Sequence, residues 1–179
     1  MIANLSRRKL LTLGSTGVLA GCGFQPVYMP TAAGRAGPAQ RELAAININL
    51  IPDRPGQLLR QDLQERLASD SGETPQRYDL AVTFSISGEG IGVEPDNAAT
   101  RIRLIGNAHW TLKARDPAQT QVTSGSARAM DAFNVLDQQY FAADIDNEQV
   151  QRRLASALAD QIAMQLAVFF RRRAAVASS

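Results

Sequence analysis

The sequence contains one cysteine, Cys22, and its surroundings favour chemistry at the sulfur atom. A single cysteine has no partner for an intramolecular disulfide, so another role for the thiol is expected. Residues 19–21 read Leu-Ala-Gly, so the two positions directly before the cysteine are small. A thiolate can form a thioether to diacylglycerol, and small residues let the chain enter the cleft of a peptidase that cuts before the cysteine. This spacing predicts acylation of Cys22.

The segment before Cys22 has the three-part plan of an export signal. Residues 6–9 are mainly basic and residues 10–20 are mostly apolar. The apolar stretch is roughly half the ~20 residues that a spanning helix needs, so a cleavable signal is favoured over a transmembrane anchor. The junction resembles a lipobox, and we predict a signal peptide over residues 1–21 with diacylglycerol and N-acyl lipid on Cys22 as the only bound group. A chance cysteine in an ordinary signal peptide is the alternative. Arg7 and Arg8 leave both the general and the twin-arginine export routes open.

Cationic side chains recur at alternate positions between residues 100 and 115. Successive side chains of a strand point to opposite faces, so one face is expected to be apolar and the other to carry the cations. Guanidinium groups bind phosphates in a bidentate manner, which makes this face a candidate contact for an anionic glycolipid or a partner. A solvated surface is the alternative. With one residue of the next predicted strand, the candidates are Arg101, Arg103, Lys113, Arg115 and Arg128.

Few residues suit catalysis or metal binding. His109 is the only histidine, and no Cys or His spacing typical of a metal site accompanies it. Ser85, Ser87 and Ser124 fall in predicted strands without the sharp turn of a nucleophile elbow. We therefore expect a protein that is not an enzyme. A tethered hydrolase that uses His109 is the weaker alternative.

Three glycines alternate between residues 88 and 92, a spacing that invites comparison with a phosphate-binding loop. Such a loop must open a helix, and no helical pattern follows here. Residues 88–99 are predicted instead to be a mobile hairpin connection.

The charge of the mature chain is close to zero. Of the 19 Lys and Arg residues, three lie at residues 7–9, which leaves 16 against 17 Asp and Glu. Three of the 16 are adjacent at residues 171–173, where they can counter the C-terminal dipole of a helix. The broad basic face that nucleic-acid binding requires is therefore not expected.

The pattern of apolar residues predicts one α+β domain over residues 42–173. Residues 22–41 are rich in Gly, Pro, Ala and Thr and are predicted to be a flexible tether, and residues 174–179 a disordered tail. Alternation of apolar residues predicts strands over residues 43–51, 78–87, 100–115 and 119–129. Apolar residues at helical spacing predict helices over residues 56–69 and 147–171, the second capped by Asp146. The order β-α-β-β-β-α predicts a two-layer sandwich, with two helices on one face of a four-stranded mixed sheet.

The element order and three short segments resemble the LptE family of lipopolysaccharide-assembly lipoproteins. The segments are residues 19–28 (Leu-Ala-Gly-Cys-Gly-Phe-Gln-Pro-Val-Tyr), 133–137 (Phe-Asn-Val-Leu-Asp) and 158–162 (Leu-Ala-Asp-Gln-Ile). The resemblance implies a lipid-anchored plug on the periplasmic side of the outer membrane. It also implies an LptD-like β-barrel as the partner and assistance in inserting lipopolysaccharide into the outer leaflet.

The sequence also bears on the membrane to which the protein is delivered and on which residues share a role with the family. Gly23 follows the cysteine where a retention signal for the inner membrane would have Asp, which favours delivery to the outer membrane. Only Cys22 carries over from the family as a functional residue. An auxiliary lipoprotein of another envelope lipid-transport system is the alternative function.

Overall fold

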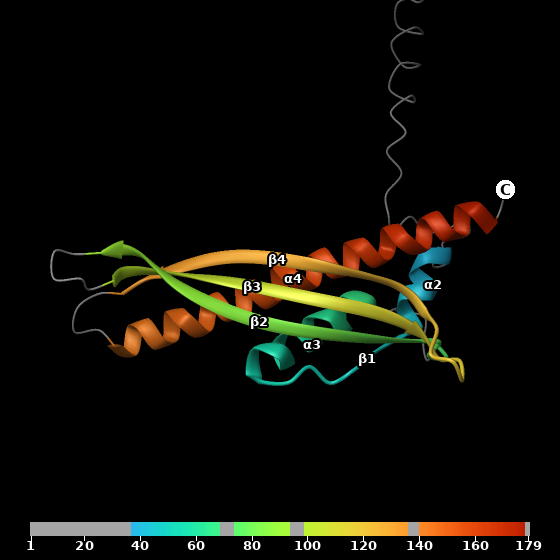
Figure 1. Ribbon diagram of the computed structural model, residues 1–179, viewed down its shortest axis with the longest axis horizontal. Helices are drawn as coiled ribbons and strands as arrows, with labels where there is room; N and C mark the ends of the chain where they lie inside the picture. Colours follow the sequence, from blue (N-terminus) through green and yellow to red (C-terminus); the bar gives the residue numbers. More distant parts are fainter. Residues whose placement is uncertain (1–36, 69–73, 94–98, 136–139, 178–179) are drawn as a thin grey trace, which may run out of the picture.

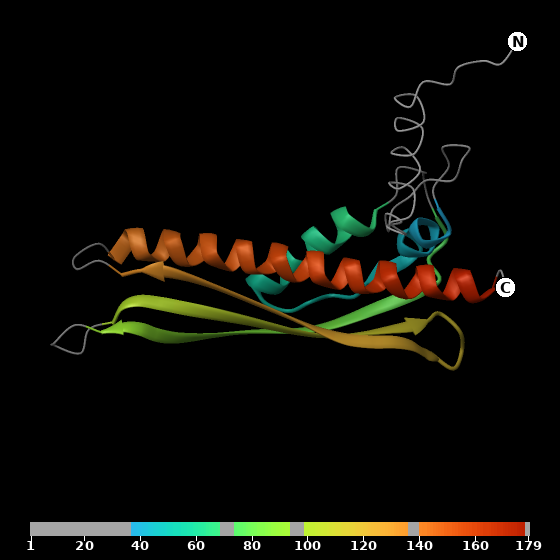
Figure 2. The ribbon, with the colours of Figure 1, turned by 90° about the horizontal axis from the view of Figure 1, so that it is seen from above.

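The computed structural model describes residues 37–68, 74–93, 99–135 and 140–177, and these residues form two layers. One layer is a four-stranded sheet, and three helices cover one of its faces (Figures 1 and 2). Cys22, the predicted signal peptide and most of the predicted tether lie outside the described residues. The elements in chain order are α2 (Pro38–Ala44), β1 (Ile46–Ile48), α3 (Arg54–Leu67), β2 (Tyr78–Val93), β3 (Ala99–Ala114), β4 (Gln121–Asn134) and α4 (Tyr140–Ala177).

The sheet has the order β1-β2-β3-β4 and is mixed, as predicted. Strand β1 pairs in parallel with β2, where Ile46 lies opposite Tyr78. Strands β2, β3 and β4 form an antiparallel meander, in which Trp110 of β3 lies between Val82 and Gly125. Two parallel strands need a crossover connection between them, and α3 provides it from β1 to β2 on the face of the sheet that the helices cover. The predicted α+β two-layer class is confirmed.

The long strands extend further than the sequence pattern indicated. Residues 88–93, predicted as part of a loop, belong to β2, and Gly88 lies opposite Leu104 of β3. The register shifts beside Gly90 and Gly92, so the glycines accompany an irregular strand end. The prediction of a connection starting at residue 88 was therefore wrong. Strand β4 also continues beyond the predicted end at residue 129, to Asn134.

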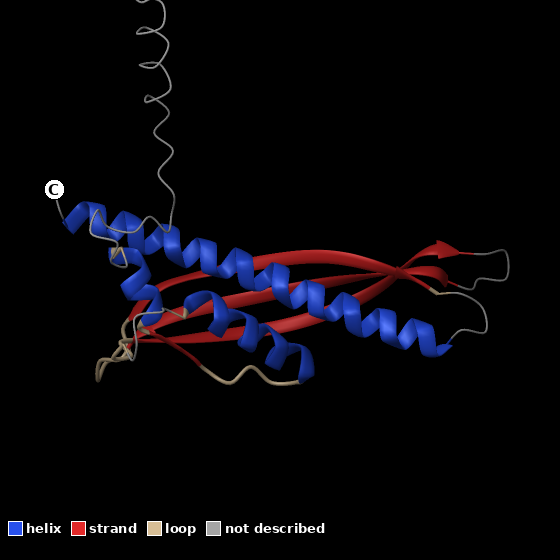
Figure 3. Ribbon diagram, turned by 180° about the vertical axis from the view of Figure 1, so that it is seen from behind, coloured by secondary structure: helices blue, strands red, loops and turns tan. Residues whose placement is uncertain are grey.

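Helix α4 has 38 residues, so it is roughly 57 Å long and crosses the sheet diagonally (Figure 3). The prediction that Asp146 caps this helix was wrong, because the helix begins at Tyr140. The predicted disordered tail is also wrong for residues 174–177, which are helical and include three alanines, the best helix former. Residues 178–179 lie outside the described residues.

Helix α2 was not predicted. Ala39 and Leu43 are four residues apart and both are buried, which is the spacing of one helical face, and Pro38 suits the first turn. The predicted strand over residues 43–51 was therefore too long at both ends, since only Ile46–Ile48 is strand. The predicted boundary between tether and domain, at residue 41, falls inside α2, so folded structure starts earlier.

The core lies between the sheet and the helices. In α3, Leu59, Leu63 and Leu67 are buried as their spacing predicted, and residue 56 is a glycine because a Cβ there would lie 2.7 Å from Ile51 Cγ2. In α4, apolar residues from Val150 to Phe170 pack on the sheet. A smaller cluster of Leu104, Val150 and Leu154 continues the core toward the far end of the sheet. No helix among the described residues is both long and apolar enough to cross a bilayer.

Candidate functional site

The face of the sheet opposite the helices is open and polar. The even-numbered residues of β3 from Leu104 to Leu112 are buried against the helices, so the odd-numbered residues point the other way. Antiparallel register places side chains of β2 and β4 beside them on this open face. The central rows of the open face carry mainly small or polar residues: Thr83, Ser85, Asn107, His109, Thr111, Ser124, Ser126 and Arg128. The neighbouring row is apolar in part, since Ile105 lies opposite Met130, which is 61% exposed.

The five candidate cations lie on or beside the open face, but the structure does not gather them into one patch. Arg103 and Lys113 are ten residues apart on β3, which is roughly 33 Å along a strand. Arg101 lies near Arg103, and Arg115 follows Lys113 at the other end. Arg128 lies opposite Asn107, in the middle of the sheet. The sequence therefore predicted correctly on which face these residues lie. The structure separates them into one pair at each end of β3 and a single cation, Arg128, between the two pairs.

Two of the five cations are held by carboxylates. Arg103 forms an ion pair with Glu89 at 2.8 Å, and Arg115 donates from Nε to Asp79 at 3.0 Å. Burial raises the pKa of Asp79, but hydrogen bonds from Asn47 and Arg115 and the charge of Arg115 outweigh it, so the pKa lies below its ordinary value. Both pairs are partly exposed, so they orient the guanidinium groups and contribute little stability.

Helix α4 covers the free edge of β4 with two glutamines. Gln161 Nε2 donates to Arg128 O at 3.0 Å, and Gln161 Oε1 accepts from Arg128 N at 3.3 Å. One turn later, Gln165 Nε2 donates to Ser126 O at 2.9 Å. Unpaired backbone groups at a sheet edge can template pairing with another chain, and these amides occupy some of them. Sequence reasoning missed this feature, although two glutamines four residues apart beside an apolar stripe could have indicated it.

His109 is exposed on the open face, opposite Thr83 of β2 and Ser126 of β4. Ser85 and Ser124 also lie on regular strands of this face, where no strand-to-helix turn presents a nucleophile. This geometry gives no support to the hydrolase alternative.

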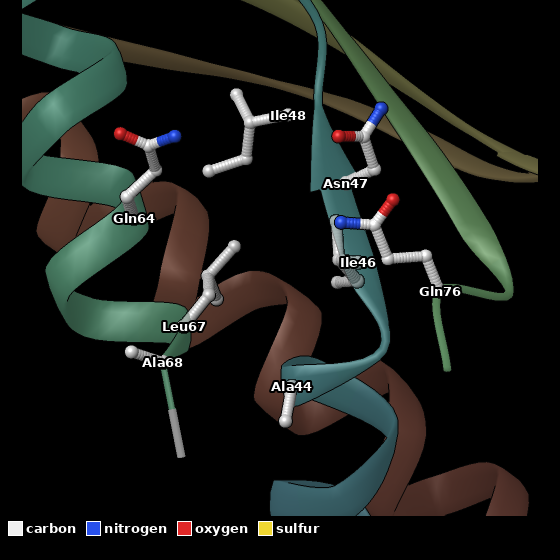
Figure 4. Close-up of a pocket in the computed structure, with 8 residues that line it drawn as sticks. All are labelled: Ala44, Ile46, Asn47, Ile48, Gln64, Leu67, Ala68 and Gln76. Atoms are coloured by element: carbon white, nitrogen blue, oxygen red, sulfur yellow. The ribbon is translucent and has the colours of Figure 1, made fainter. Parts of the chain in front are cut away.

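Two pockets lie near the end of the domain where the strands meet α2. The first, of about 190 Å³, separates Gln64 and Leu67 of α3 from Asn47 of β1 (Figure 4). Its lining is apolar or carries amides: Ala44, Ile46, Asn47, Ile48, Gln64, Leu67, Ala68 and Gln76. A pocket of this size is below the ~300–1,000 Å³ usual for a drug-sized ligand. The second pocket, of about 350 Å³, has arginines on its rim: Arg77, Arg115 and Arg173.

Comparison with protein families identifies the fold and its biological role. The family model described as LptE, lipopolysaccharide-assembly, matches residues 43–166, which run from the end of α2 into the last third of α4. The chain belongs to the LptE family. The match covers β1 to β4, α3 and most of α4, so it includes the open face and the glutamines on the β4 edge. The function of the LptE family is lipopolysaccharide assembly, and this chain shares it.

Solved structures of lipoproteins share the fold. A lipoprotein from Caulobacter crescentus CB15 is 25% identical, with a TM-score of 0.60 over 74% of this chain and 96% of that chain. The rare lipoprotein B from Shewanella oneidensis is 13% identical, with a TM-score of 0.51 over 69% of this chain and 92% of that chain. No curated protein matches this chain.

The structure explains one segment that carried the resemblance to the LptE family. Within residues 158–162, Leu158, Ala159 and Ile162 are buried in the core, and Gln161 binds the backbone of Arg128. This segment therefore joins α4 to both the core and the β4 edge. Segment 133–137 begins at the end of β4, and its residues 136–137 lie outside the described residues.

Proposed function

We propose that this member of the LptE family is an outer-membrane lipoprotein that plugs a β-barrel lipopolysaccharide translocon. In this role it assists folding of the barrel and insertion of lipopolysaccharide into the outer leaflet, without covalent chemistry. The observation that carries the proposal is the family match across residues 43–166. The partner, an LptD-like β-barrel, and the periplasmic side of the outer membrane are parts of this proposal.

The shape and surface of the domain support a plug. The sheet is roughly 50 Å long, from the 16 residues of β3, and its four strands span only about 15 Å. The interior of an outer-membrane barrel is polar and contains water, so an enclosed domain needs polar outer surfaces. The open face has such a surface, because its central rows carry hydroxyl and amide side chains.

A lipid on Cys22 would hold the domain beside the barrel. Gly37, the first described residue, lies 15 positions after Cys22, and the chain between them can span at most about 50 Å. Each buried CH₂ contributes only ~0.8 kcal/mol, so a single acyl chain binds a membrane marginally. Two or three acyl chains together make the anchor effectively permanent. We therefore propose that the lipid positions the protein at the membrane and that the folded domain carries out the function.

Contact with lipopolysaccharide is proposed for the two cationic groups of the open face and for Arg128. The separation of Arg103 from Lys113 suits a long ligand or two ligand groups better than one phosphate. The members of these groups are Arg101, Arg103, Lys113, Arg115 and Arg128.

Affinity capture from solubilised outer membranes tests the proposed partner. The tagged chain should bring down a large β-barrel protein, and depletion of the chain should lower the amount of lipopolysaccharide at the cell surface. Capture without a barrel, together with unchanged surface lipopolysaccharide, would contradict the proposal. If the chain fractionated with the inner membrane and its transport proteins, the alternative of another lipid-transport system would replace it.

The proposed lipid on Cys22 needs its own test. Cells fed labelled palmitate should incorporate the label into the wild-type chain and not into Cys22→Ser. Processing of the signal peptide should fail in the same variant, since acylation precedes cleavage at a lipobox. Equal label in both chains would show that Cys22 is not the acylated residue.

A further inference from the structure

The end of the domain formed by α2, the C-terminal end of α4 and the β3–β4 turn is basic. Among the described residues, seven cations lie here: Arg41, Arg77, Lys113, Arg115, Arg171, Arg172 and Arg173. Three carboxylates of the described residues lie with them: Glu42, Asp79 and Asp116. We call this surface the basic end. Its excess of positive charge contrasts with the near-neutral balance of 16 basic and 17 acidic residues that remains when the three cations of residues 7–9 are set aside.

The pocket of about 350 Å³ at the basic end can receive an anionic group. It is lined by three arginines, Arg77, Arg115 and Arg173, against one carboxylate, Asp116, and Tyr78 and Val122 contribute apolar surface. Glu42 accepts from Arg77 at 2.7 Å, and Asp79 accepts from Arg115 at 3.0 Å, so two of the guanidinium groups are held in place. A guanidinium has five N–H donors, so each retains donors for a second anion such as a phosphate.

The chain approaches the domain at this same end. Glu42 of α2 accepts hydrogen bonds from Arg77 and from the hydroxyl of Tyr78, both beside the pocket. Figure 1 shows α2 and the C-terminal end of α4 together, at the end of the sheet where β2 begins and β3 finishes. A lipid on Cys22 would therefore bring the basic end, and not the far end, toward the membrane surface.

We propose that the basic end docks on the anionic phospholipid headgroups of the leaflet that holds the anchor, with a headgroup phosphate in the arginine pocket. An anionic lipid surface attracts a basic segment within about a Debye length, ~10 Å at 0.1 M salt. Docking would fix the orientation of the long, thin domain, because the basic end has an excess of cations, whereas at the other end Arg103 is paired with Glu89 and Arg153 with Asp131.

The inference rests on the proposed function for the anchor alone. It assigns Lys113 and Arg115 to the phospholipid surface and leaves Arg101, Arg103 and Arg128 as the candidates for contact with lipopolysaccharide.

Vesicle binding tests the proposal without a lipid anchor or a barrel. The probe is the mature chain, residues 22–179, with Cys22→Ser to prevent acylation. Its binding is measured to vesicles of phosphatidylcholine alone and to vesicles that also contain phosphatidylglycerol.

The test variant is Arg172→Gln with Arg173→Gln. The matched control is Arg54→Gln with Arg152→Gln. This variant also removes two exposed cations, but both of them pair with Glu148 and lie outside the basic end. Thermal unfolding checks that every variant is folded.

The proposal predicts binding to the phosphatidylglycerol vesicles that salt weakens, with no comparable binding to phosphatidylcholine. The test variant should bind roughly tenfold or more weakly than the parent, and the control should bind like the parent. Three results would overturn the proposal: equal binding to both vesicle types, equal loss in both variants, or binding of inorganic phosphate without binding of vesicles. Because no partner takes part, failure here would leave the proposed plug function to its own test.

Discussion

Trp110 Nε1 donates a hydrogen bond of 3.1 Å to Gln165 Oε1, and this contact joins the middle of the sheet to α4. Trp110 is 4% exposed, so its N–H needs a partner within the protein. Gln165 in turn donates to Ser126 O on the β4 edge. One side chain therefore satisfies the buried indole and covers an edge carbonyl, which ties the core of the domain to its boundary.

Gln165→Leu is expected to destabilise the domain by about 1–3 kcal/mol, because the indole N–H would remain buried without a partner. Urea unfolding measures the change in free energy. Gln149→Ala is the control, since Gln149 is an exposed glutamine on the same helix. A Gln165→Leu variant as stable as the control would show that water or another group replaces the amide.

Gly125→Ala is expected to destabilise the domain by about 1–3 kcal/mol, through overpacking. A Cβ at residue 125 would lie 2.6 Å from Trp110 Cζ2, and the tryptophan cannot shift without losing its bond to Gln165. The combination of Gly125→Ala with Trp110→Leu should cost less than the sum of the two single changes. Strict additivity of the three unfolding free energies would contradict the proposed steric contact.

The ion pair between Asp131 of β4 and Arg153 of α4 should make stability depend on acid pH. Burial raises the pKa of Asp131, but hydrogen bonds from Arg153 and from its neighbour's backbone N–H outweigh it, so the pKa is lowered. A carboxylate with a lowered folded pKa stabilises the fold above its unfolded value of ~3.9, and this contribution is lost as pH falls through the lowered value.

Asp131→Asn should therefore be less stable than wild type at neutral pH, and the difference should shrink below about pH 4. Thermal unfolding between neutral and acid pH measures it. Asp144→Asn, a change to an exposed carboxylate on α4, is the matched control. If the difference between wild type and Asp131→Asn stayed constant across this range, the ion pair would not be the source of the acid dependence.

The sequence predicted those parts of the fold in which the apolar period is regular. The leucines of α3 and the alternation in β3 indicated one helix, one long strand and the face on which the cations lie. The stretch from Leu43 to Leu50 misled the prediction, because a short run of apolar residues fits a strand or the end of a helix equally well. The structure places Leu43 on a helix and leaves Leu50 77% exposed.

Element ends and tertiary contacts were harder to predict. Residues 140–149 show no regular apolar stripe, so the first turns of α4 were missed, and Asp146 resembled a cap within them. The separation of Arg103 from Lys113 follows from strand length, and the sequence alone could have indicated it. The spacing of Gln161 and Gln165 could have indicated a polar contact beside the apolar stripe. Which strand edge the two side chains reach depends on how α4 crosses the sheet, and no local pattern contains that information.

Photocrosslinking from both sides of the domain tests the plug most directly. Ser126 lies on the open face, and Met164 is an exposed residue on the opposite side of the molecule, in α4. A photoreactive amino acid at either position should crosslink in outer membranes to the same large β-barrel, at residues that line its lumen. Crosslinks from only one of the two positions would mean that the domain docks on a surface and is not enclosed, and this result would contradict the account.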